Sequence, residues 1–215
     1  MYPLRCLGIN SMMISNKHKF VYMTVAKCGT STMFKHLREL YDDIKLVGGH
    51  PRVVEPQHLD YFCFTVVRHP YTRALSMWHH ILDRKKMPLN FDGGTYYVDI
   101  STFTKFIKWR NVAWSKITSY MPALRTQHYQ LSKCRIDNVL RLETLSNDFM
   151  DLPFYSGPPI LFSKENPALT PYSYGEYTDE LVLLVNEIFA KDFAFGAYEM
   201  SPNKKELLEV IKCLS

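Results

Sequence analysis

The sequence predicts an α/β fold with a parallel sheet, because two strand-like segments each lead directly into a helix-like segment. An apolar run that favours β structure begins at Phe20 and ends in Lys27, a glycine and three hydroxyl residues, and helical periodicity follows from about Met33. A second apolar run, residues 61–67, ends in an arginine and leads into a helical pattern over 71–83. Such near-continuous apolar runs are typical of parallel strands that are covered on both faces.

The rest of the chain predicts a mixture of further helices, one short strand and irregular segments. Thr178 is suited to cap the helix that follows it, and the aromatic and proline-rich stretch 153–177 is too long for an ordinary connection. We expect helices over 102–109, weakly over 112–120, over 178–189 and over 203–214, a strand over 138–142 with a helix starting at Glu143, and a loop over 86–100.

Length and composition indicate one soluble globular domain over residues 1–215. The net charge of +5 is mild and scattered, so nucleic acid is not an expected partner. Five widely spaced cysteines without a C-x-x-C pair predict neither a disulfide framework nor a metal site, and they favour a reducing compartment. Since no signal peptide or apolar window of transmembrane length is present, we expect a cytoplasmic protein; an anchor outside this sequence stays an open alternative.

The residues from Lys27 to Thr32 predict a first anion-binding site. A strand, a tight turn and a helix in this order place backbone N–H groups and hydroxyls at a helix N-terminus, where an anion is stabilised. The lysine precedes the glycine, so the spacing G-x-x-x-x-G-K-[ST] of a nucleotide-binding P-loop is absent. G-x-G-x-x-G is absent too, which disfavours a dinucleotide-binding fold.

A second anion-binding site is predicted where the second strand ends. Arg68 lies at the carboxyl end of this strand and offers a planar fork of donors to phosphate oxygens, while Ser76 adds a hydroxyl two turns into the next helix. Arg73 either touches the same anion or braces the helix. Open α/β sheets bind ligands at the carboxyl ends of their strands, so we expect both anion sites to lie at one edge.

Together these segments resemble the sulfotransferase superfamily, most closely its carbohydrate (Golgi-type family 2) branch and the soluble microbial and viral relatives of that branch. Residues 27–32, Lys-Cys-Gly-Thr-Ser-Thr, resemble the 5′-phosphosulfate loop P-K-[SCA]-[GA]-[ST]-[ST], with Ala26 in place of the proline. Residues 68–76 resemble the 3′-phosphate motif R-x-P-x-x-R-x-x-S. Looser matches are Arg141-Leu142-Glu143 with Asp148-Phe149, and Asp192-Phe193 with Phe195-Gly196-x-Tyr198.

The resemblance implies transfer of a sulfuryl group from 3′-phosphoadenosine 5′-phosphosulfate (PAPS) to a hydroxyl acceptor, with adenosine 3′,5′-bisphosphate as product and no metal. The acceptor would be a carbohydrate, as a glycan or glycolipid, and the fold a P-loop-like three-layer sandwich with a central parallel sheet flanked by helices. Lys27 would neutralise charge on the leaving phosphate oxygen. The implied donor-binding residues are Lys27, Cys28, Gly29, Thr30, Ser31, Thr32, Arg68, Arg73, Ser76 and Lys164.

Lys164 would act with Asn166 in a loop that closes over the donor, and a solvated loop lysine is the alternative. His50, which follows two glycines as in related sugar sulfotransferases, is the expected general base, against the alternative of a surface histidine. His58 is the next candidate, and Glu55 would serve an acceptor amine. Cys28 has no partner base in the sequence, so it is not expected to act as a nucleophile.

Two other classes of function stay open at this point. A kinase or nucleotidase would use the first anion site for a nucleoside triphosphate, but it requires Mg²⁺ ligands and a lysine after the glycine, and neither is found. A module that binds phosphoadenosine or a glycan without turnover would keep Lys27, Arg68 and Ser76 as they are. The identity of the acceptor and the oligomeric state stay open as well.

Overall fold

The computed structural model describes residues 11–48, 56–83, 89–91, 94–96, 99–112, 122–163 and 173–213. The chain divides into two compact units, each made of two stretches of sequence. The first unit comprises residues 1–68 and 127–167, and the second comprises residues 69–126 and 168–215. The expected single domain over 1–215 stays a prediction, since this division describes compactness and not independent folding.

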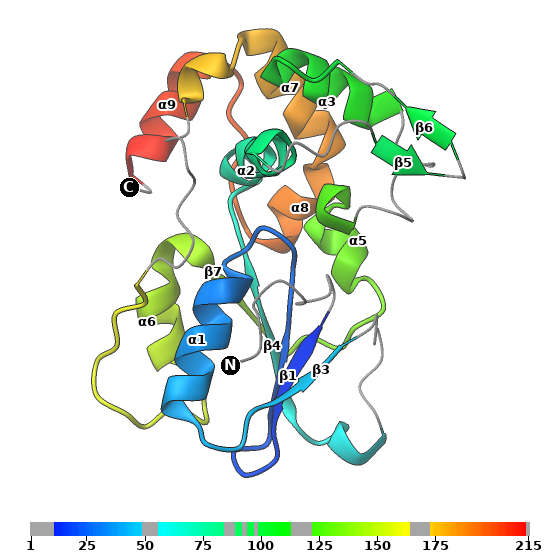
Figure 1. The fold of residues 1–215 in the computed structure, drawn as a ribbon. Coiled ribbons are helices and arrows are strands. Elements are labelled where there is room, and N and C mark those ends of the chain that lie inside the picture. The colour runs from blue at the N-terminus through cyan, green and yellow to red at the C-terminus, as the bar shows by residue number, and fades with distance from the viewer. Residues whose placement is uncertain are drawn as a thin grey trace. The chain divides into compact units, whose positions relative to one another are not determined.

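The first unit is built on a five-stranded sheet in the order β3-β1-β2-β4-β7 (Figure 1). Strands β2, β4 and β7 are parallel, whereas β1 is antiparallel to both β2 and β3. The strand bounds are β1 Met12–Ser15, β2 Phe20–Met23, β3 Lys45–Val47, β4 Phe62–Val67 and β7 Asn138–Arg141. The predicted α/β fold is confirmed, and the sheet is mixed because the short connection from β1 to β2 allows only an antiparallel pair.

Helices α1 and α6 cover one face of this sheet, because side chains alternate between the two faces of each strand. Phe20 and Tyr22 of β2 and Phe64 of β4 point to this face and share one buried cluster with Met33 of α1 and Phe149 of α6. Val21, Cys63, Thr65 and Val67 on the opposite face are buried as well. The bounds are α1 Thr30–Leu40, α5 Gln127–Leu131 and α6 Leu145–Met150, with 3₁₀ turns η2 Pro56–His58 and η4 Leu142–Thr144.

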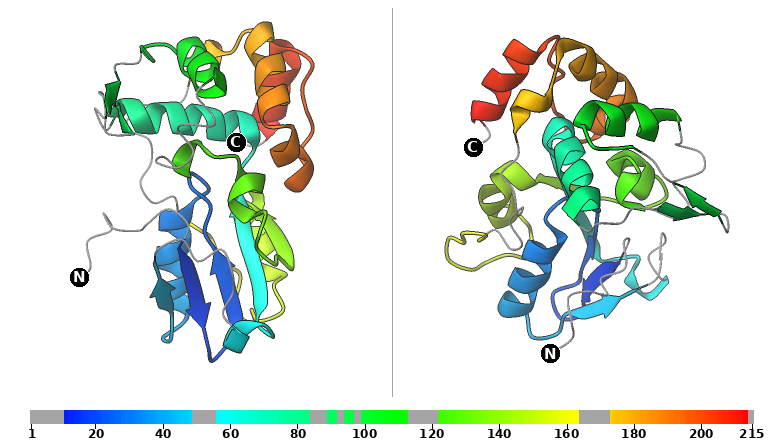
Figure 2. Two further views of the ribbon diagram at one scale, coloured as in Figure 1. Left: turned by 90° about the vertical axis from the view of Figure 1, so that its right-hand side faces the viewer. Right: turned by 45° about the horizontal axis from the view of Figure 1, so that its top comes forward.

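The second unit is mainly helical, and its helix α7 contacts α2, α3, α8 and α9. Figure 2 shows α9 in red beside α7 in orange. The shared core is rich in aromatic residues, among them Tyr71, Phe103, Tyr177, Phe189 and Phe193. The bounds are α2 Pro70–Asp83, α3 Phe103–Val112, α7 Asp179–Ile188, α8 Ala190–Phe195 and α9 Lys204–Cys213, with 3₁₀ turns η3 Pro122–Leu124 and η5 Tyr174–Glu176 and a hairpin of β5 Leu89–Phe91 and β6 Gly94–Tyr96.

Most predicted elements are confirmed to within a few residues, including the cap at Thr178, whose side chain accepts a hydrogen bond from the N–H of Leu181. Two predictions need correction. The expected loop over 86–100 contains the β5–β6 hairpin, because strands of three residues are too short to show periodicity. The expected helix start at Glu143 is a 3₁₀ turn, and α6 begins at Leu145. The weak helix predicted over 112–120 lies outside the described residues beyond Val112.

Within the described ranges, no helix combines the length and the apolar character that crossing a membrane requires.

Candidate functional site

The first part of the site is the sharp turn that connects β2 to α1. Lys27 and Gly29 both have left-handed backbone conformations, with φ angles of 69° and 73°. A Cβ atom on Gly29 would lie 2.6 Å from Cδ1 of Leu142. This position therefore requires glycine for two reasons, the positive φ and the close approach of Leu142. The lysine tolerates the same conformation at an energetic cost, as residues at functional sites often do.

Donor groups gather where α1 begins. The first N–H groups of a helix have no acceptor within the helix and lie at the positive end of its dipole. No acidic side chain occupies the first turn of α1. Thr30 donates its hydroxyl hydrogen to the carbonyl of Val25 over 3.1 Å, which ties the turn to the end of the strand. Lys27, Gly29, Thr30 and Ser31 are half-buried, whereas Cys28 and Thr32 are buried. The turn can thus bring positive charge and hydrogen-bond donors to an anion.

Tyr22 lies close to this turn and adds no charge to it. The pKa of Tyr22 is strongly raised, and burial is the largest cause. The negative charge that Cys28 would carry as a thiolate raises the pKa further, whereas a hydrogen bond with the side chain of Thr30 lowers it. The phenol therefore stays protonated near neutral pH. A neutral hydroxyl near the turn does not compete with an anion for the helix N-terminus.

Arg68 reaches the same edge of the sheet as the turn. Strands β2 and β4 are parallel and in direct contact, with Phe20 opposite Phe62 and Met23 opposite Thr65. The chain therefore leaves both strands at one edge, through the turn in the first case and through Arg68, directly after Val67, in the second. Arg68 is half-buried. The two segments that sequence reasoning picked out in the first unit are thus brought together by strand pairing.

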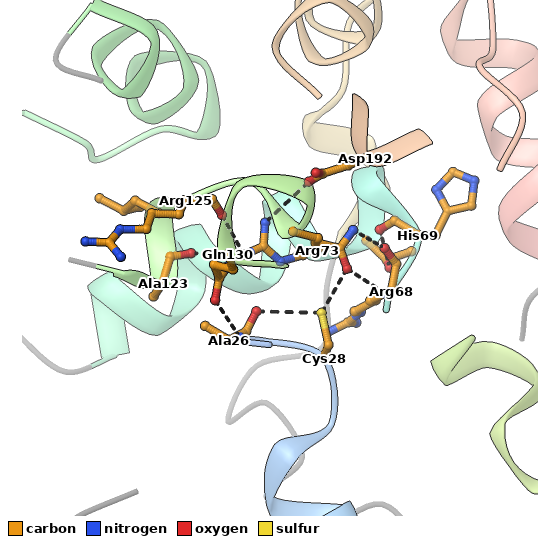
Figure 3. Close-up of polar contacts among 12 residues, drawn as sticks. Ala26, Cys28, Arg68, His69, Arg73, Ala123, Arg125, Gln130 and Asp192 are labelled. Atoms are coloured by element: carbon orange, nitrogen blue, oxygen red, sulfur yellow. Dashed lines mark hydrogen bonds and ion pairs between the residues drawn. The ribbon is translucent and has the colours of Figure 1, made fainter. Parts of the chain in front are cut away.

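Two glutamines of α5, which sequence reasoning missed as site residues, hold these segments. The side-chain oxygen of Gln127 accepts hydrogen bonds from the backbone N–H of Arg68 (2.8 Å) and from the thiol of Cys28 (3.0 Å), and its NH₂ group donates to the carbonyl of Arg68 (2.9 Å). The side-chain oxygen of Gln130 accepts from the N–H of Ala26 (3.1 Å; Figure 3). A spacing of three residues places both glutamines on one helix face, which is the signal that could have found them.

The end of β7 also supports the turn. The same carboxylate oxygen of Asp148 accepts two hydrogen bonds, one from the N–H of Arg141 (2.8 Å) and one from the hydroxyl of Thr144 (2.9 Å). These bonds hold the 3₁₀ turn that carries Leu142, whose side chain approaches Gly29. The segment from Arg141 to Asp148 therefore holds Leu142 against the turn.

Arg73 lies in the second unit, where protein groups engage its guanidinium group. This group is fully buried and donates to the carbonyls of Ala123 (3.3 Å) and Arg125 (2.8 Å), and it pairs with Asp192 at 3.9 Å (Figure 3). Arg110 donates to the carbonyl between them, that of Leu124. Burial, followed by the charge of Arg73, lowers the pKa of Arg110 to about 9, so the guanidinium group of Arg110 is still charged at neutral pH. These contacts favour the bracing alternative for Arg73.

The other motif residues of the second unit are buried too. Ser76 lies in α2 with 3% of its surface exposed. His69 is buried between the rings of Tyr71, Phe193 and Tyr198, as expected of a structural residue. The segment from Asp192 to Tyr198, which matched only loosely in sequence, thus supplies the carboxylate that pairs with Arg73 and two of the rings that surround His69.

The candidates for the general base differ in whether the structure describes them. His58 is buried and precedes β4, with its ring against Tyr61. Since Arg68 follows the six residues of β4, His58 lies about 20 Å away at the amino edge of the sheet, which disfavours it as a base. His50 and Glu55 lie outside the described residues, as do Lys164 and Asn166.

The profile of the Sulfotransferase family, of the family 2 type, matches residues 10–152, more than half of the chain. The chain belongs to the sulfotransferase family. Comparisons with curated proteins and with solved structures found no match. The family predicted from residues 27–32 and 68–76 is therefore confirmed, and with it sulfuryl transfer as the general type of reaction. Asp192 and Tyr198 lie beyond the matched range.

In this sulfotransferase, the described side chains offer no cluster of three or more His, Cys, Asp or Glu residues that could hold a metal ion. The groups that gather at the carboxyl edge of the first unit are instead a lysine, an arginine, hydroxyls and backbone N–H groups. Such groups bind phosphate and sulfate oxygens and stabilise charge that develops on them.

Proposed function

We propose that this sulfotransferase transfers the sulfuryl group of PAPS to a hydroxyl of a carbohydrate acceptor, a glycan or a glycolipid. The observation that carries the proposal is the pairing of β2 with β4, which puts the turn before α1 and Arg68 at one edge of the sheet. PAPS has two separate anionic groups, the 5′-phosphosulfate and the 3′-phosphate, and two cationic segments suit them. The carbohydrate acceptor rests on the resemblance to the family 2 branch, and the mild positive charge tolerates an anionic glycan.

The first segment is proposed to hold the 5′-phosphosulfate. Backbone N–H groups of Gly29, Thr30, Ser31 and Thr32, with the hydroxyls of Ser31 and Thr32, would bind its oxygens. The N–H of Cys28 and the hydroxyl of Thr30 both donate to the carbonyl of Val25, so these two predicted ligands would exchange that acceptor for the donor molecule. The ammonium group of Lys27 would neutralise charge that develops on the leaving 5′-phosphate oxygen. The guanidinium group of Arg68 is proposed to bind the 3′-phosphate through its fork of donors. Ser76 stays a predicted ligand of that phosphate, and Lys164 stays a predicted contact over the donor.

The proposed reaction is an in-line displacement at sulfur. The acceptor oxygen forms a bond to sulfur while the bond from sulfur to the 5′-phosphate oxygen breaks, and that oxygen keeps the electron pair. The proton of the acceptor hydroxyl passes to the imidazole of His50, the predicted base. The products are the sulfated acceptor and adenosine 3′,5′-bisphosphate.

Ligand-induced stabilisation tests the donor. We expect adenosine 3′,5′-bisphosphate to raise the melting temperature of the protein and ATP with Mg²⁺ to raise it much less, because a ligand stabilises the state that binds it. Stabilisation by ATP with Mg²⁺ but not by the bisphosphate would refute the proposal. Transfer of label from PAPS to a panel of glycans, glycolipids and tyrosyl peptides then identifies the acceptor, and transfer to peptides alone would refute a carbohydrate acceptor.

Replacing two histidines separately tests the base. His50→Ala is expected to lower the transfer rate by about 10²–10⁴-fold, the usual contribution of a positioned base. His58→Ala is the matched control and is expected to leave the rate within about twofold, since His58 lies at the amino edge of the sheet. A full rate for His50→Ala would exclude it as the base.

A further inference from the structure

We infer that Gln127 is a positioning residue that holds Arg68 and the turn before α1 at a fixed separation, so that the two anionic groups of the donor are bound together. The inference rests on the proposed function, because it assigns one anionic group to each segment. It concerns a residue outside both sequence motifs. It is carried by three hydrogen bonds of one fully buried amide.

The contacts of Gln127 with Arg68 involve the backbone and leave the guanidinium group to other partners. The amide of Gln127 accepts from the N–H of Arg68 and donates to the carbonyl of the same residue, at 2.8 and 2.9 Å. Such a two-point contact fixes the peptide groups on both sides of the Arg68 Cα atom. It therefore sets the point from which the arginine side chain starts, directly after the last residue of β4.

The same oxygen atom of Gln127 reaches the turn before α1. It accepts a hydrogen bond from the thiol of Cys28 over 3.0 Å, and Cys28 adjoins Lys27 on one side and Gly29 on the other. One buried amide is thus shared by the segments that we assign to the 5′ and 3′ groups. Since a buried amide is costly to leave without hydrogen bonds, a shift of either segment would be opposed by the loss of these bonds.

Gln130 provides the internal comparison. It lies one turn further along α5, is buried to 4% exposure, and holds the turn through the N–H of Ala26. The described contact of its side chain is with the turn, whereas Gln127 contacts both the turn and the backbone of Arg68. If Gln127 couples the two segments, replacing it must weaken the binding of a ligand with two phosphates more than that of a ligand with one. Replacing Gln130 must weaken the binding of both ligands to a similar extent.

The experiment measures affinities for adenosine 3′,5′-bisphosphate and adenosine 5′-phosphate by calorimetry. In Gln127→Met the affinity for the bisphosphate is expected to fall at least tenfold and that for the 5′-phosphate less than threefold. In Gln130→Met both affinities are expected to fall by similar factors. An unchanged ratio of the two affinities in Gln127→Met, or the same change of ratio in both variants, would overturn the inference.

A second measurement separates positioning from general stabilisation. In the background Arg68→Ala, Gln127→Met is expected to lower the affinity for the bisphosphate by less than threefold, because the guanidinium group is gone and only the contact with the turn is lost. A full tenfold loss in that background would overturn the inference. Gln127→Asn, which keeps the amide but shortens its reach, replaces Gln127→Met in the same cycle if the methionine variant does not fold.

The two proposals fail in different ways. If the unmodified protein does not bind the bisphosphate, the proposed function is wrong and the inference falls with it. If the unmodified protein binds the bisphosphate more tightly than the 5′-phosphate but Gln127→Met keeps that preference, only the inference is wrong.

Discussion

Lys27, in the turn before α1 of the first unit, and Arg73, in α2 of the second unit, are both cations of the sulfotransferase motifs, but their exposure and their contacts differ. Lys27 keeps part of its surface accessible, in a left-handed backbone conformation beside a helix N-terminus. Arg73 has no accessible surface, and its guanidinium group contacts two carbonyl groups and the carboxylate of Asp192.

Whether a cation of such a motif stays accessible to a ligand or is engaged by the protein depends on the groups that surround it. A charge that the protein buries must be matched by acceptors and counter-charges of the protein itself, because desolvation is costly. Arg73 meets this condition through the carbonyls of Ala123 and Arg125 and the carboxylate of Asp192, contacts that favour a bracing role. Lys27 follows one of two parallel strands that end at the same edge of the sheet, and its proposed role is to act on the donor.

The largest expected effect is on stability, for Arg73→Met. Removing this guanidinium group leaves the buried carboxylate of Asp192 and two carbonyl groups with fewer partners, so the free energy of unfolding should fall by about 3–5 kcal/mol. Urea denaturation measures this. Lys108→Met is the control in the same unit: Lys108 forms an exposed ion pair with Glu180, and its loss should cost less than about 1 kcal/mol.

The opposite outcome for Arg73 would contradict its bracing role. If Arg73→Met kept the stability of the unmodified protein but lost affinity for adenosine 3′,5′-bisphosphate, Arg73 would be a ligand of the donor and not a bracing residue.

The second effect is on catalysis, for Lys27→Ala. Loss of a positive charge placed at the leaving group should lower the transfer rate by about 10²–10³-fold, with little loss of stability. Lys19→Ala is a matched control, because Lys19 also has a positive φ, of 51°, but precedes β2 at the other edge of the sheet. Rates of sulfuryl transfer and melting temperatures check both variants. Equal rates for the two variants would remove Lys27 from the proposed mechanism.

The smallest effect concerns the geometry of the turn, for Gly29→Ala. The positive φ and the approach of Leu142 should together cost about 1–3 kcal/mol of stability, and the affinity for adenosine 3′,5′-bisphosphate should fall. Gly48→Ala is the control, since nothing lies within 4 Å of the added Cβ atom. Adding Leu142→Ala to Gly29→Ala should recover the steric part of the loss. An unchanged denaturation midpoint for Gly29→Ala would contradict the close approach.

Local patterns were sufficient for much of this protein. The apolar runs that become β2, β4 and β7 could be predicted because strands covered on both faces are almost continuously apolar, and the helical patterns of α1, α2, α7 and α9 because burial in a helix repeats every 3.6 residues. The order strand, turn and helix also predicted that residues 27–32 and Arg68 would lie at one edge of the sheet, which the pairing of β2 with β4 confirms, while anion binding at that edge stays a prediction. The family followed from residues 27–32 and 68–76 and is confirmed.

Which side chains meet could be seen only in the folded chain. Strand β1 contains only three consecutive apolar residues, Met12, Met13 and Ile14, too short a run to predict a strand, so the mixed character of the sheet appeared only through its pairing with β2 and β3. Periodicity shows which face of an element is buried and does not show which partner a polar side chain finds. Gln127 lies 59 positions from Arg68, and Arg73 contacts a carbonyl 52 positions away. The contacts from which we infer a positioning role for Gln127 and a bracing role for Arg73 therefore became visible only in the folded chain.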